Sequence, residues 1–426
     1  MSRATHTRRA SRQAPPRRRS FDATTSVARR LPPRLASGAP NGDRHQVAVN
    51  PAALPAPPDY AGRSLTNLLP AVAAHLGVPG CDEDRLGLAD AGRYVVFMVD
   101  GMGWELVMGA LAELPELADL MADARELITV VPSTTVSALT SLGTGLPPGG
   151  HGLVGYRFWE PTLGGYLAPL TWNVPVDPAV VQPHPTLLQR SAAAGVAVRR
   201  VVPTDQVASG FSAAALRGSD AVGVGEHDAA EWVGRVVEAA STGPRALVYA
   251  YDRSLDHAGH ARGLDSPEWL AAAREVDRRI GLLRARLAPD TVLLVTADHG
   301  MVDVPRGCRV HVERTPELNA DLRHVGGEAR FRHLYTDQPA AVAARWRDWA
   351  GDRAWVAEKD DAVAAGWFGP VGPLAAGRLG DVVVAARRDW AFLSRRTPVE
   401  AKLVGMHGSL TSRELRVPLF TARGAR

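Results

Sequence analysis

Apolar residues along this chain fall into two alternating patterns. Short apolar runs rich in β-branched residues, such as residues 291–297, are typical of strands buried in a parallel sheet. The segments between them repeat apolar residues with the helical period. The pattern predicts strands at 94–99, 126–131, 198–202, 245–250 and 291–297, and helices at 67–76, 104–122, 135–143, 186–194, 226–240 and 266–287. This alternation indicates an α/β fold with a central, mostly parallel sheet sandwiched by helices.

Two stretches depart from the alternation. Residues 151–185 are rich in Gly, Pro, Trp and Tyr, and we expect them to form an excursion over the rim of the sheet. Residues 305–400 hold short strand-like runs at 332–335 and 382–385 around a helix expected at 338–349. We expect a smaller α+β subdomain there, at about residues 305–400.

The overall composition is ordinary, and its informative feature is the small number of cysteines. The chain has 426 residues, 46% hydrophobic and 22% charged, which is ordinary for a globular protein. Its two cysteines, Cys81 and Cys308, exclude a disulfide framework and favour a reducing compartment. They also exclude cysteine-based metal clusters, so any metal ligands must be His or carboxylate.

The net charge of +4 hides two opposite parts. Residues 1–46 contain eleven Arg and two Asp, a balance of +9, so the remaining 380 residues carry −5. We expect residues 1–46 to be a disordered basic tail and the Pro/Ala-rich residues 47–63 to be a linker. An acidic body suits divalent cations, and it argues against nucleic acid as a partner of the folded part.

Export and membrane insertion are not expected. Arg18-Arg19-Ser20-Phe21 resembles a twin-arginine signal, but residues 22–30 provide no apolar core after it. No apolar run approaches the length needed to span a bilayer. We therefore expect a cytoplasmic protein without a membrane span.

Three predicted strands end in residues that can bind metal ions. Asp100 follows 94–99, Asp298 and His299 follow 291–297, and Asp256-x-x-x-His260 follows 245–250. Open α/β sheets place their ligand sites at the carboxyl ends of the strands. The convergence of Asp and His at one edge therefore indicates a metal-dependent enzyme.

A cluster of hydroxyl residues follows the second predicted strand. Pro132-Ser133-Thr134-Thr135 begins a predicted helix, where free N–H groups and the helix dipole favour phosphate oxygens. Taken alone, such residues are ordinary capping chemistry. Their place in the same sheet as three ligand-bearing strands favours a catalytic interpretation.

Together these segments resemble a known superfamily. The ordered set comprises Asp100-Gly101, Pro-x-x-Thr135 with Thr144-Gly145-Leu146 and His151-Gly152, Asp256-x-x-x-His260, Thr296-Ala-Asp298-His299-Gly300-Met301, and Met406-His407-Gly408. It is similar to the alkaline phosphatase superfamily, and within it to the nucleotide pyrophosphatase/phosphodiesterase branch. The resemblance covers about residues 90–420 and implies an alkaline phosphatase-like catalytic domain at 64–426.

The resemblance implies two zinc ions. Asp100, Asp298 and His299 would hold one ion together with the oxygen of Thr135, and Asp256, His260 and His407 would hold the other. Six His and Asp ligands suit zinc, although other divalent ions could also fit. Two such ions clamp the entering and leaving oxygens of an in-line displacement.

The same resemblance implies a role for Thr135. It would be the nucleophile and form a phosphothreonine intermediate that water then hydrolyses. Thr135 lies three residues after the Pro and nine before the Thr of Thr-Gly, as the family pattern requires, whereas Thr134 fits neither count. We expect Thr134 only to cap the helix.

The chain departs from this branch around the substrate. The branch places an Asn after His-Gly to donate to the phosphate; here Tyr156 stands near that position, and it or Arg157 could donate instead. Val136 replaces the Phe that follows the nucleophile and stacks a base, whereas Tyr251 matches a second stacking aromatic. Phe158, Trp159 and Trp172 could rebuild an apolar leaving-group pocket or could simply pack a loop.

These observations favour a two-zinc phosphodiesterase or nucleotide pyrophosphatase acting on a small-molecule phosphate ester or nucleotide. The alternative is a phosphomonoesterase on the same scaffold, which needs an extra cation near the phosphate; a non-catalytic phosphate-ester binder fits less well. The segment Cys-x-Pro-Ser-Arg of a sulfatase is absent from the sequence, and the Ser context of a cofactor-independent mutase is not found. His151 and His333 are expected to be structural, and Glu275 and Asp277 to lie on a solvated helix face.

Overall fold

The structure is a computed structural model that describes residues 54–225 and 228–425. The expected basic tail, at 1–46, and residues 47–53 of the expected linker lie outside the described residues. The boundaries expected for the linker, the catalytic domain and the subdomain therefore stay predictions.

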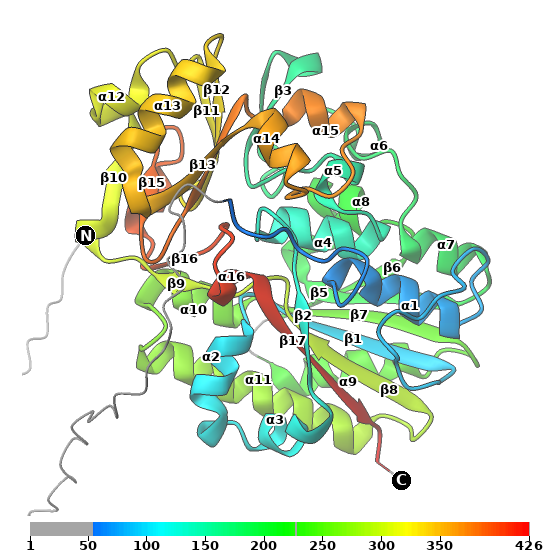
Figure 1. The fold of residues 1–426 in the computed structure, drawn as a ribbon. Helices are drawn as coiled ribbons and strands as arrows, with labels where there is room; N and C mark the ends of the chain where they lie inside the picture. The colour runs from blue at the N-terminus through cyan, green and yellow to red at the C-terminus, as the bar shows by residue number, and fades with distance from the viewer. Residues whose placement is uncertain (1–53, 226–227, 426) are drawn as a thin grey trace, which may run out of the picture. The chain divides into compact units, whose positions relative to one another are not determined.

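A seven-stranded sheet forms the centre of the described part, in the order β2-β17-β8-β1-β7-β5-β6 (Figure 1). β1 pairs in parallel with β7 and β8, and β5 pairs in parallel with β6 and β7. β17 runs antiparallel to β8 and β2. The strands are β1 (Arg93–Val99), β2 (Arg125–Ile128), β5 (Ala197–Pro203), β6 (Asp220–Val224), β7 (Ala246–Asp252), β8 (Thr291–Thr296) and β17 (Arg416–Arg423). The predicted α/β fold with a mostly parallel sheet is confirmed.

Helices cover both faces of this sheet. Figure 1 shows α3, α9 and α11 on one side and α1, α4 and α7 on the other. Both faces of the central strands are therefore covered, and every residue of β7 and β8 is buried. The α-helices before β8 are α1 (Leu68–His75), α2 (Trp104–Ala110), α3 (Pro115–Asp119), α4 (Thr135–Thr144), α5 (Pro148–His151), α6 (Pro178–Val181), α7 (Leu187–Ala193), α8 (Gly210–Ala215), α9 (Ala229–Ala240), α10 (Ser254–Arg262) and α11 (Pro267–Arg286).

Local sequence signals set several helix ends. α7 begins with a capping box, in which the side chains of Thr186 and Gln189 each accept from the other's backbone N–H. Asp228 caps α9 by accepting from Glu231 N. α4 ends at Gly145, whose φ of 72° is a left-handed conformation that glycine adopts without steric cost.

A second, antiparallel sheet has the order β11-β12-β14-β13. It has its own core, in which Trp346 of α13 packs with Phe392 and Leu334. Its strands are β11 (His324–Glu328), β12 (Phe331–Tyr335), β13 (Ala354–Glu358) and β14 (Val382–Ala386), and the helices of this part are α12 (Pro316–Asn319), α13 (Pro339–Ala350), α14 (Lys359–Ala364), α15 (Pro373–Arg378) and α16 (Ser412–Leu415). Three small ribbons complete the described strands: β3 (Phe158–Glu160) with β4 (Gly165–Leu167), β9 (Val302–Asp303) with β16 (Gly405–Met406), and β10 (Arg309–His311) with β15 (Ala391–Leu393).

Some predicted elements differ from the observed ones. The helix predicted at 104–122 is broken into α2, α3 and short 3₁₀ turns, because Pro115 has no N–H to donate and its ring clashes with the preceding turn. The strand predicted at 126–131 stops at Ile128, since Thr129 N turns to Leu415 O and Pro132 cannot donate. Asp277 is buried rather than solvated, because its carboxylate accepts from Glu116 N and Leu117 N at the start of α3.

No helix among the described residues combines the length and the apolar character needed to cross a bilayer.

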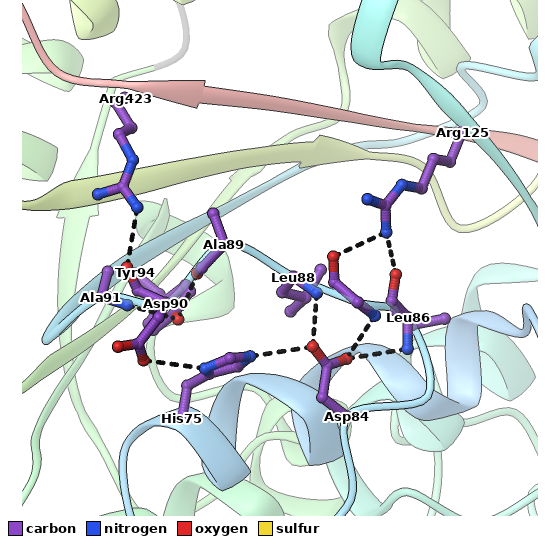
Figure 2. Close-up of polar contacts among 11 residues, drawn as sticks. His75, Asp84, Leu86, Leu88, Ala89, Asp90, Ala91, Tyr94, Arg125 and Arg423 are labelled. Carbon is purple, nitrogen blue, oxygen red and sulfur yellow. Dashed lines mark hydrogen bonds and ion pairs between the residues drawn. The ribbon is translucent and has the colours of Figure 1, made fainter.

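A polar cluster fastens the connection between α1 and β1 (Figure 2). His75, in the last turn of α1, lies with its two ring nitrogens 3.0 Å from Asp90 Oδ1 and 2.9 Å from Asp84 Oδ2. Asp84 Oδ1 also accepts from Leu86 N and Gly87 N at 2.9 Å, which closes the loop on itself. The hydrogen bonds from both nitrogens to carboxylates raise the pKa of His75 above its ordinary value, although burial opposes them. The charged imidazolium is therefore the form that ties this loop down.

We predict that His75→Gln destabilises the protein more at acidic than at alkaline pH. Because the folded pKa of His75 is raised, its contribution is fully present below the unfolded pKa of about 6.5 and is lost as the pH rises through the folded pKa. The expected loss is roughly 1 kcal/mol near pH 5.5 and close to zero near pH 9, measured by urea unfolding. Asp90→Asn should keep most of this pH dependence, because the Asp90 side chain is 88% exposed. Equal losses for His75→Gln at both pH values would contradict the interpretation.

Candidate functional site

An aspartate-rich group, consisting of Asp100, Asp298 and His299, lies at the carboxyl ends of β1 and β8. These strands are parallel neighbours, so their ends meet at one edge of the sheet. His299 Nε2 lies 3.4 Å from both Asp100 Oδ1 and Asp298 Oδ2. Gly101 N and His299 N donate to Asp298 Oδ1 at 3.1 and 3.0 Å, which leaves the other oxygen of Asp298 to face the group.

A histidine-rich group, consisting of Asp256, His260 and His407, lies beside it. Asp256 and His260 are four residues apart on α10, which follows β7, so they share one helix face. His407 follows β16 near the end of the chain. Asp256 Oδ1 lies 3.3 Å from His260 Nε2 and 4.0 Å from His407 Nε2. In each of the two groups the ligand atoms lie within 4.8 Å of one another.

All three histidines are held in the orientation that a metal ligand needs. His299 Nδ1 donates to Gly300 O at 3.0 Å, His260 Nδ1 to Gly405 O at 2.7 Å, and His407 Nδ1 to Ser133 O at 3.0 Å. A carbonyl can only accept, so Nδ1 carries the proton and Nε2 keeps its lone pair. The rings of His299 and His407 stack at 3.6 Å between centroids, which places the two groups side by side.

The carboxylates of the two groups repel one another in a buried setting. Burial raises the pKa of Asp100 well above its ordinary range, and the charges of Asp298 and Asp256 raise it further. Burial and the neighbouring His299 and His260 lower the pKa of His407, so it is neutral. Buried negative charge of this density needs positive charge to offset it.

Three carboxylate oxygens in these groups have no hydrogen-bond partner among the described residues: Asp100 Oδ1, Asp256 Oδ1 and Asp298 Oδ2. Buried polar atoms are nearly always satisfied, so orphaned oxygens at this density need an explanation. Three carboxylates and three imidazole Nε2 atoms form a donor set that suits a borderline divalent ion such as zinc. The residues present therefore fit two metal ions.

Thr135 is the first residue of α4 and faces the aspartate-rich group. Its Oγ1 lies 3.2 Å from His299 Nε2, and the residue is 8% exposed. The N–H groups of the first helical turn have no partner within the helix, so they are available to the oxygens of an anion placed there.

Thr134, the N-cap residue of α4, does not cap the helix with its side chain as expected. Its hydroxyl makes no capping hydrogen bond. Thr134 instead lowers the pKa of Glu328, the last residue of β11.

A cavity of about 370 Å³ opens beside the two groups. Asp100, Asp256, His260 and His407 line it together with Thr135, so the candidate ligands and the hydroxyl share one space. Much of the lining is apolar, and its residues are Leu139, Leu170, Phe211, Leu216, Val399, Leu403 and Met406.

The structure brings two of the three expected substrate-binding residues to this cavity. Tyr156 and Tyr251 both line it. Tyr251 is only 3% exposed, and its hydroxyl donates to Asp100 Oδ2, so it positions a candidate ligand. Arg157 is not among the lining residues: its guanidinium donates to Arg396 O at 2.6 Å and lies 4.0 Å from the centre of the Tyr166 ring.

The aromatic residues considered for a leaving-group pocket also lie elsewhere. Phe158 is fully buried, Trp159 stacks on His324 at 3.9 Å, and Trp172 Nε1 donates to Val176 O. These residues pack the 151–185 excursion, of which Leu170 and Tyr156 reach the cavity.

His151 and His333 are structural, as expected. Leu153 N donates to Nδ1 of His151, and Nε2 of His151 lies 2.9 Å from Ser141 Oγ. His333 Nε2 donates to Val154 O at 2.8 Å, while Gly380 N donates to its Nδ1. Neither belongs to a candidate metal group among the described residues.

Several residues at the site carry no signal in the sequence. Phe211 and Leu216 come from α8 and the residue after it, and Glu328 comes from the second sheet. Glu328 ends a glycine-containing strand with no spacing pattern that relates it to the other site residues. Long-range packing alone brings it beside Thr134.

Comparisons with solved structures identify the fold. Murine ectonucleotide pyrophosphatase/phosphodiesterase 5 superposes with a TM-score of 0.63 at 19% identity, over 78% of this chain and 88% of that one. An inactive threonine-to-alanine variant of the same protein, in complex with AMP, has a TM-score of 0.61 at 18% identity, with the same coverage. Phosphonoacetate hydrolase from Sinorhizobium meliloti, in complex with phosphonoformate, has a TM-score of 0.59 at 20% identity, over 78% of this chain and 90% of that one.

Sequence comparison gives a relative and a family. Phosphopentomutase from Methylobacterium nodulans is 31% identical over 169 residues, which is 39% of this chain and only 40% of that relative. A sequence model of type I phosphodiesterase/nucleotide pyrophosphatase matches residues 94–410, a range that contains every candidate ligand and Thr135. The chain therefore belongs to the type I phosphodiesterase/nucleotide pyrophosphatase family, within the alkaline phosphatase superfamily.

Proposed function

We propose that this protein is a two-zinc hydrolase of phosphate diesters or phosphoanhydrides that uses Thr135 as its nucleophile. Family membership supports a phosphoester hydrolase. The observation that carries the proposal is the convergence of three orphaned carboxylate oxygens and three oriented Nε2 atoms beside a hydroxyl at a helix N-terminus.

The two groups divide the proposed metal ions between them. Asp100, Asp298 and His299 would hold the ion nearer Thr135, and the histidine-rich group would hold the other. Such ions lower the pKa of a bound hydroxyl and neutralise charge on phosphoryl oxygens. Tyr251 contributes by fixing Asp100 through its hydroxyl.

In the proposed first step Thr135 Oγ1 attacks phosphorus in line with the leaving oxygen. The new bond joins Oγ1 to phosphorus, the bond to the leaving oxygen breaks with its electron pair, and the hydroxyl proton of Thr135 ends on the leaving group. The N–H groups at the start of α4 stabilise charge on the non-bridging oxygens. Water then attacks the phosphothreonine and releases the hydroxyl of Thr135. An inactive threonine-to-alanine variant of a structural relative, in complex with AMP, supports both the residue type and a small phosphate-containing substrate.

The charges around the cavity favour a diester over a monoester. Among the described lining residues Arg253 is the one arginine, and Asp205 binds it through both oxygens at 2.9 and 3.0 Å. Arg157 points elsewhere. A monoester dianion needs an additional cation, whereas a diester carries a single negative charge and can place its second substituent against the apolar lining. We therefore rank the phosphomonoesterase alternative second.

We predict that Thr135→Ala lowers kcat for bis-p-nitrophenyl phosphate by at least about 10³-fold, because it removes the attacking atom. Thr135→Ser, which keeps a hydroxyl, should retain measurable turnover. Thr140→Ala is the matched control, since the Thr140 hydroxyl bonds to Val136 O within the same helix. Full activity in Thr135→Ala would remove this residue from the mechanism.

We predict that kcat/KM for bis-p-nitrophenyl phosphate exceeds that for p-nitrophenyl phosphate by about tenfold or more, a difference of at least about 1.4 kcal/mol in transition-state stabilisation. Steady-state rates at saturating zinc test this. A panel of dinucleoside polyphosphates, nucleoside triphosphates and monoesters would then show which leaving group the cavity takes. Equal or better turnover of the monoester would reverse the ranking.

We predict that the purified protein binds two divalent ions per chain, measured by elemental analysis. Chelation should lower the melting temperature, because it leaves the buried carboxylates to repel one another. Asp298→Asn should bind one ion and gain less stability from zinc, yet be at least as stable as wild type without metal. Asp220→Asn, at a side chain that is 79% exposed, is the control. Fewer than two ions in the wild type would overturn the dinuclear site.

A further inference from the structure

Glu328 is a buried acid on the cavity wall that the proposed mechanism leaves without a role. It is the last residue of β11 in the second sheet, it is 8% exposed, and it lines the same cavity as Thr135. Its Oε1 has no hydrogen-bond partner among the described residues, and it belongs to neither candidate metal group. A buried, unsatisfied carboxyl group is costly, so its presence in a substrate cavity indicates a ligand contact.

The surroundings of Glu328 hold the carboxyl group close to the nucleophile. Gly408, which lies beside it and next to His407, pairs with Ser133, two residues before Thr135. Thr134 and Thr135 line the same cavity as Glu328. A Cβ at Gly408 would lie 2.7 Å from Glu328 Cγ, and the φ of this glycine is 127°, so a side chain there would displace the acid. Glycine at 408 thus makes room for Glu328.

The charged groups that face Glu328 do not neutralise it. Arg332 is the cation that lowers the pKa of Glu328, but its guanidinium binds Glu400 and donates to Phe392 O. Glu414, whose charge also acts on Glu328, is bound by Arg330. Tyr156, whose pKa the charge of Glu328 raises, is a further titratable neighbour. Burial raises the pKa of Glu328 to about 8, with the charges of Glu400 and Glu414 adding to the effect, so a neutral acid with a proton to donate is favoured at neutral pH.

One of the two donors expected from the segment after His151 does not reach the cavity. Tyr156 lines it, whereas Arg157 is directed to Arg396 O. Glu328 reaches the same cavity from a different sheet. A phosphate oxygen placed against Thr135 and the start of α4 would be the acceptor that Oε1 lacks.

We propose that the carboxyl group of Glu328 donates a hydrogen bond from Oε1 to a non-bridging oxygen of the substrate phosphoryl group and so acts as a catalytic residue. This inference rests on the proposed function, because it takes Thr135 as the place where phosphorus is held. An uncharged donor orients the phosphoryl group without adding positive charge, which suits the monoanion of a diester.

The test compares Glu328→Gln with Glu328→Ala. Glutamine keeps a neutral donor at nearly the same place, so kcat/KM for bis-p-nitrophenyl phosphate should stay within about threefold of wild type. Alanine removes the donor, and the expected loss is about 10²-fold, the typical effect of deleting one donor to a phosphoryl or acyl oxyanion. Glu313→Gln, at a glutamate in a different pocket, is the control and should match wild type.

Two further measurements separate this role from a structural one. Infrared difference spectra of wild type with and without inorganic phosphate should show the carbonyl band of a protonated carboxyl group shifting, and Glu328→Gln should lack that band. Phosphate affinity by calorimetry should fall about tenfold or more in Glu328→Ala and stay near wild type in Glu328→Gln. Metal content should be unchanged in both variants, and Glu328→Gln should melt no lower than wild type, because a costly unsatisfied acid is being removed.

The outcomes distinguish this inference from the proposed function. Glu328→Gln as impaired as Glu328→Ala would show that the charged form is required and would overturn the donor role. Full activity and full phosphate affinity in Glu328→Ala would overturn any contact. If wild type failed to hydrolyse diesters, the proposed function would fall, yet phosphate binding and its infrared signature would still decide whether Glu328 touches a phosphate oxygen.

Discussion

Repulsion among buried carboxylates governs how the centre of this protein is built. Asp100, Asp298 and Asp256 come from three different segments and lie close together, each buried and with an oxygen that nothing in the described protein satisfies. Burying these carboxylates lowers the stability of the folded protein unless positive charge lies between them. Nearby donors offset part of this negative charge. Backbone N–H groups donate to Asp298, the hydroxyl of Tyr251 donates to Asp100, and α4 begins beside both.

The histidines show how the backbone contributes to the same end. Each of the three candidate ligand histidines gives its Nδ1 proton to a carbonyl, and those carbonyls belong to residues 133, 300 and 405. The tautomer is thus set by the main chain and does not depend on a second side chain. The site is ready to bind because its ligands have no better partner than a metal ion.

The last candidate ligand reaches the site through the second sheet. His407 lies on a segment that returns to the centre after β14, and two buried ion pairs fasten that return. Arg330 binds Glu414 through two nitrogens at 2.6 and 2.8 Å, and Arg332 binds Glu400. Buried ion pairs contribute little net stability, but losing one partner is costly, so they enforce one arrangement of the chain. Glu328 lies two and four residues before these arginines, so the same ion pairs help to hold it at the cavity wall.

Local patterns in the sequence predicted the sheet, the Asp and His residues that follow three of its strands, and the place of Thr135 at a helix start. The division of the ligands into two groups, with His407 in the second, came from the family resemblance. A buried strand appears as an apolar run, Asp256 and His260 show helical spacing, and Asp298 and His299 adjoin in the chain. Prediction failed where a single residue interrupts a pattern, as Pro115 does, or where a distant element buries a polar residue on a helix, as at Asp277.

Other features emerged only when the chain was folded. Arg157 turns away from the cavity, Glu328 lines it from the second sheet, and apolar residues from α8 form part of the cavity wall. Each of these depends on contacts between segments far apart in the chain. Short-range periodicity records which side of a strand or helix is buried, but it does not encode which distant segment buries it.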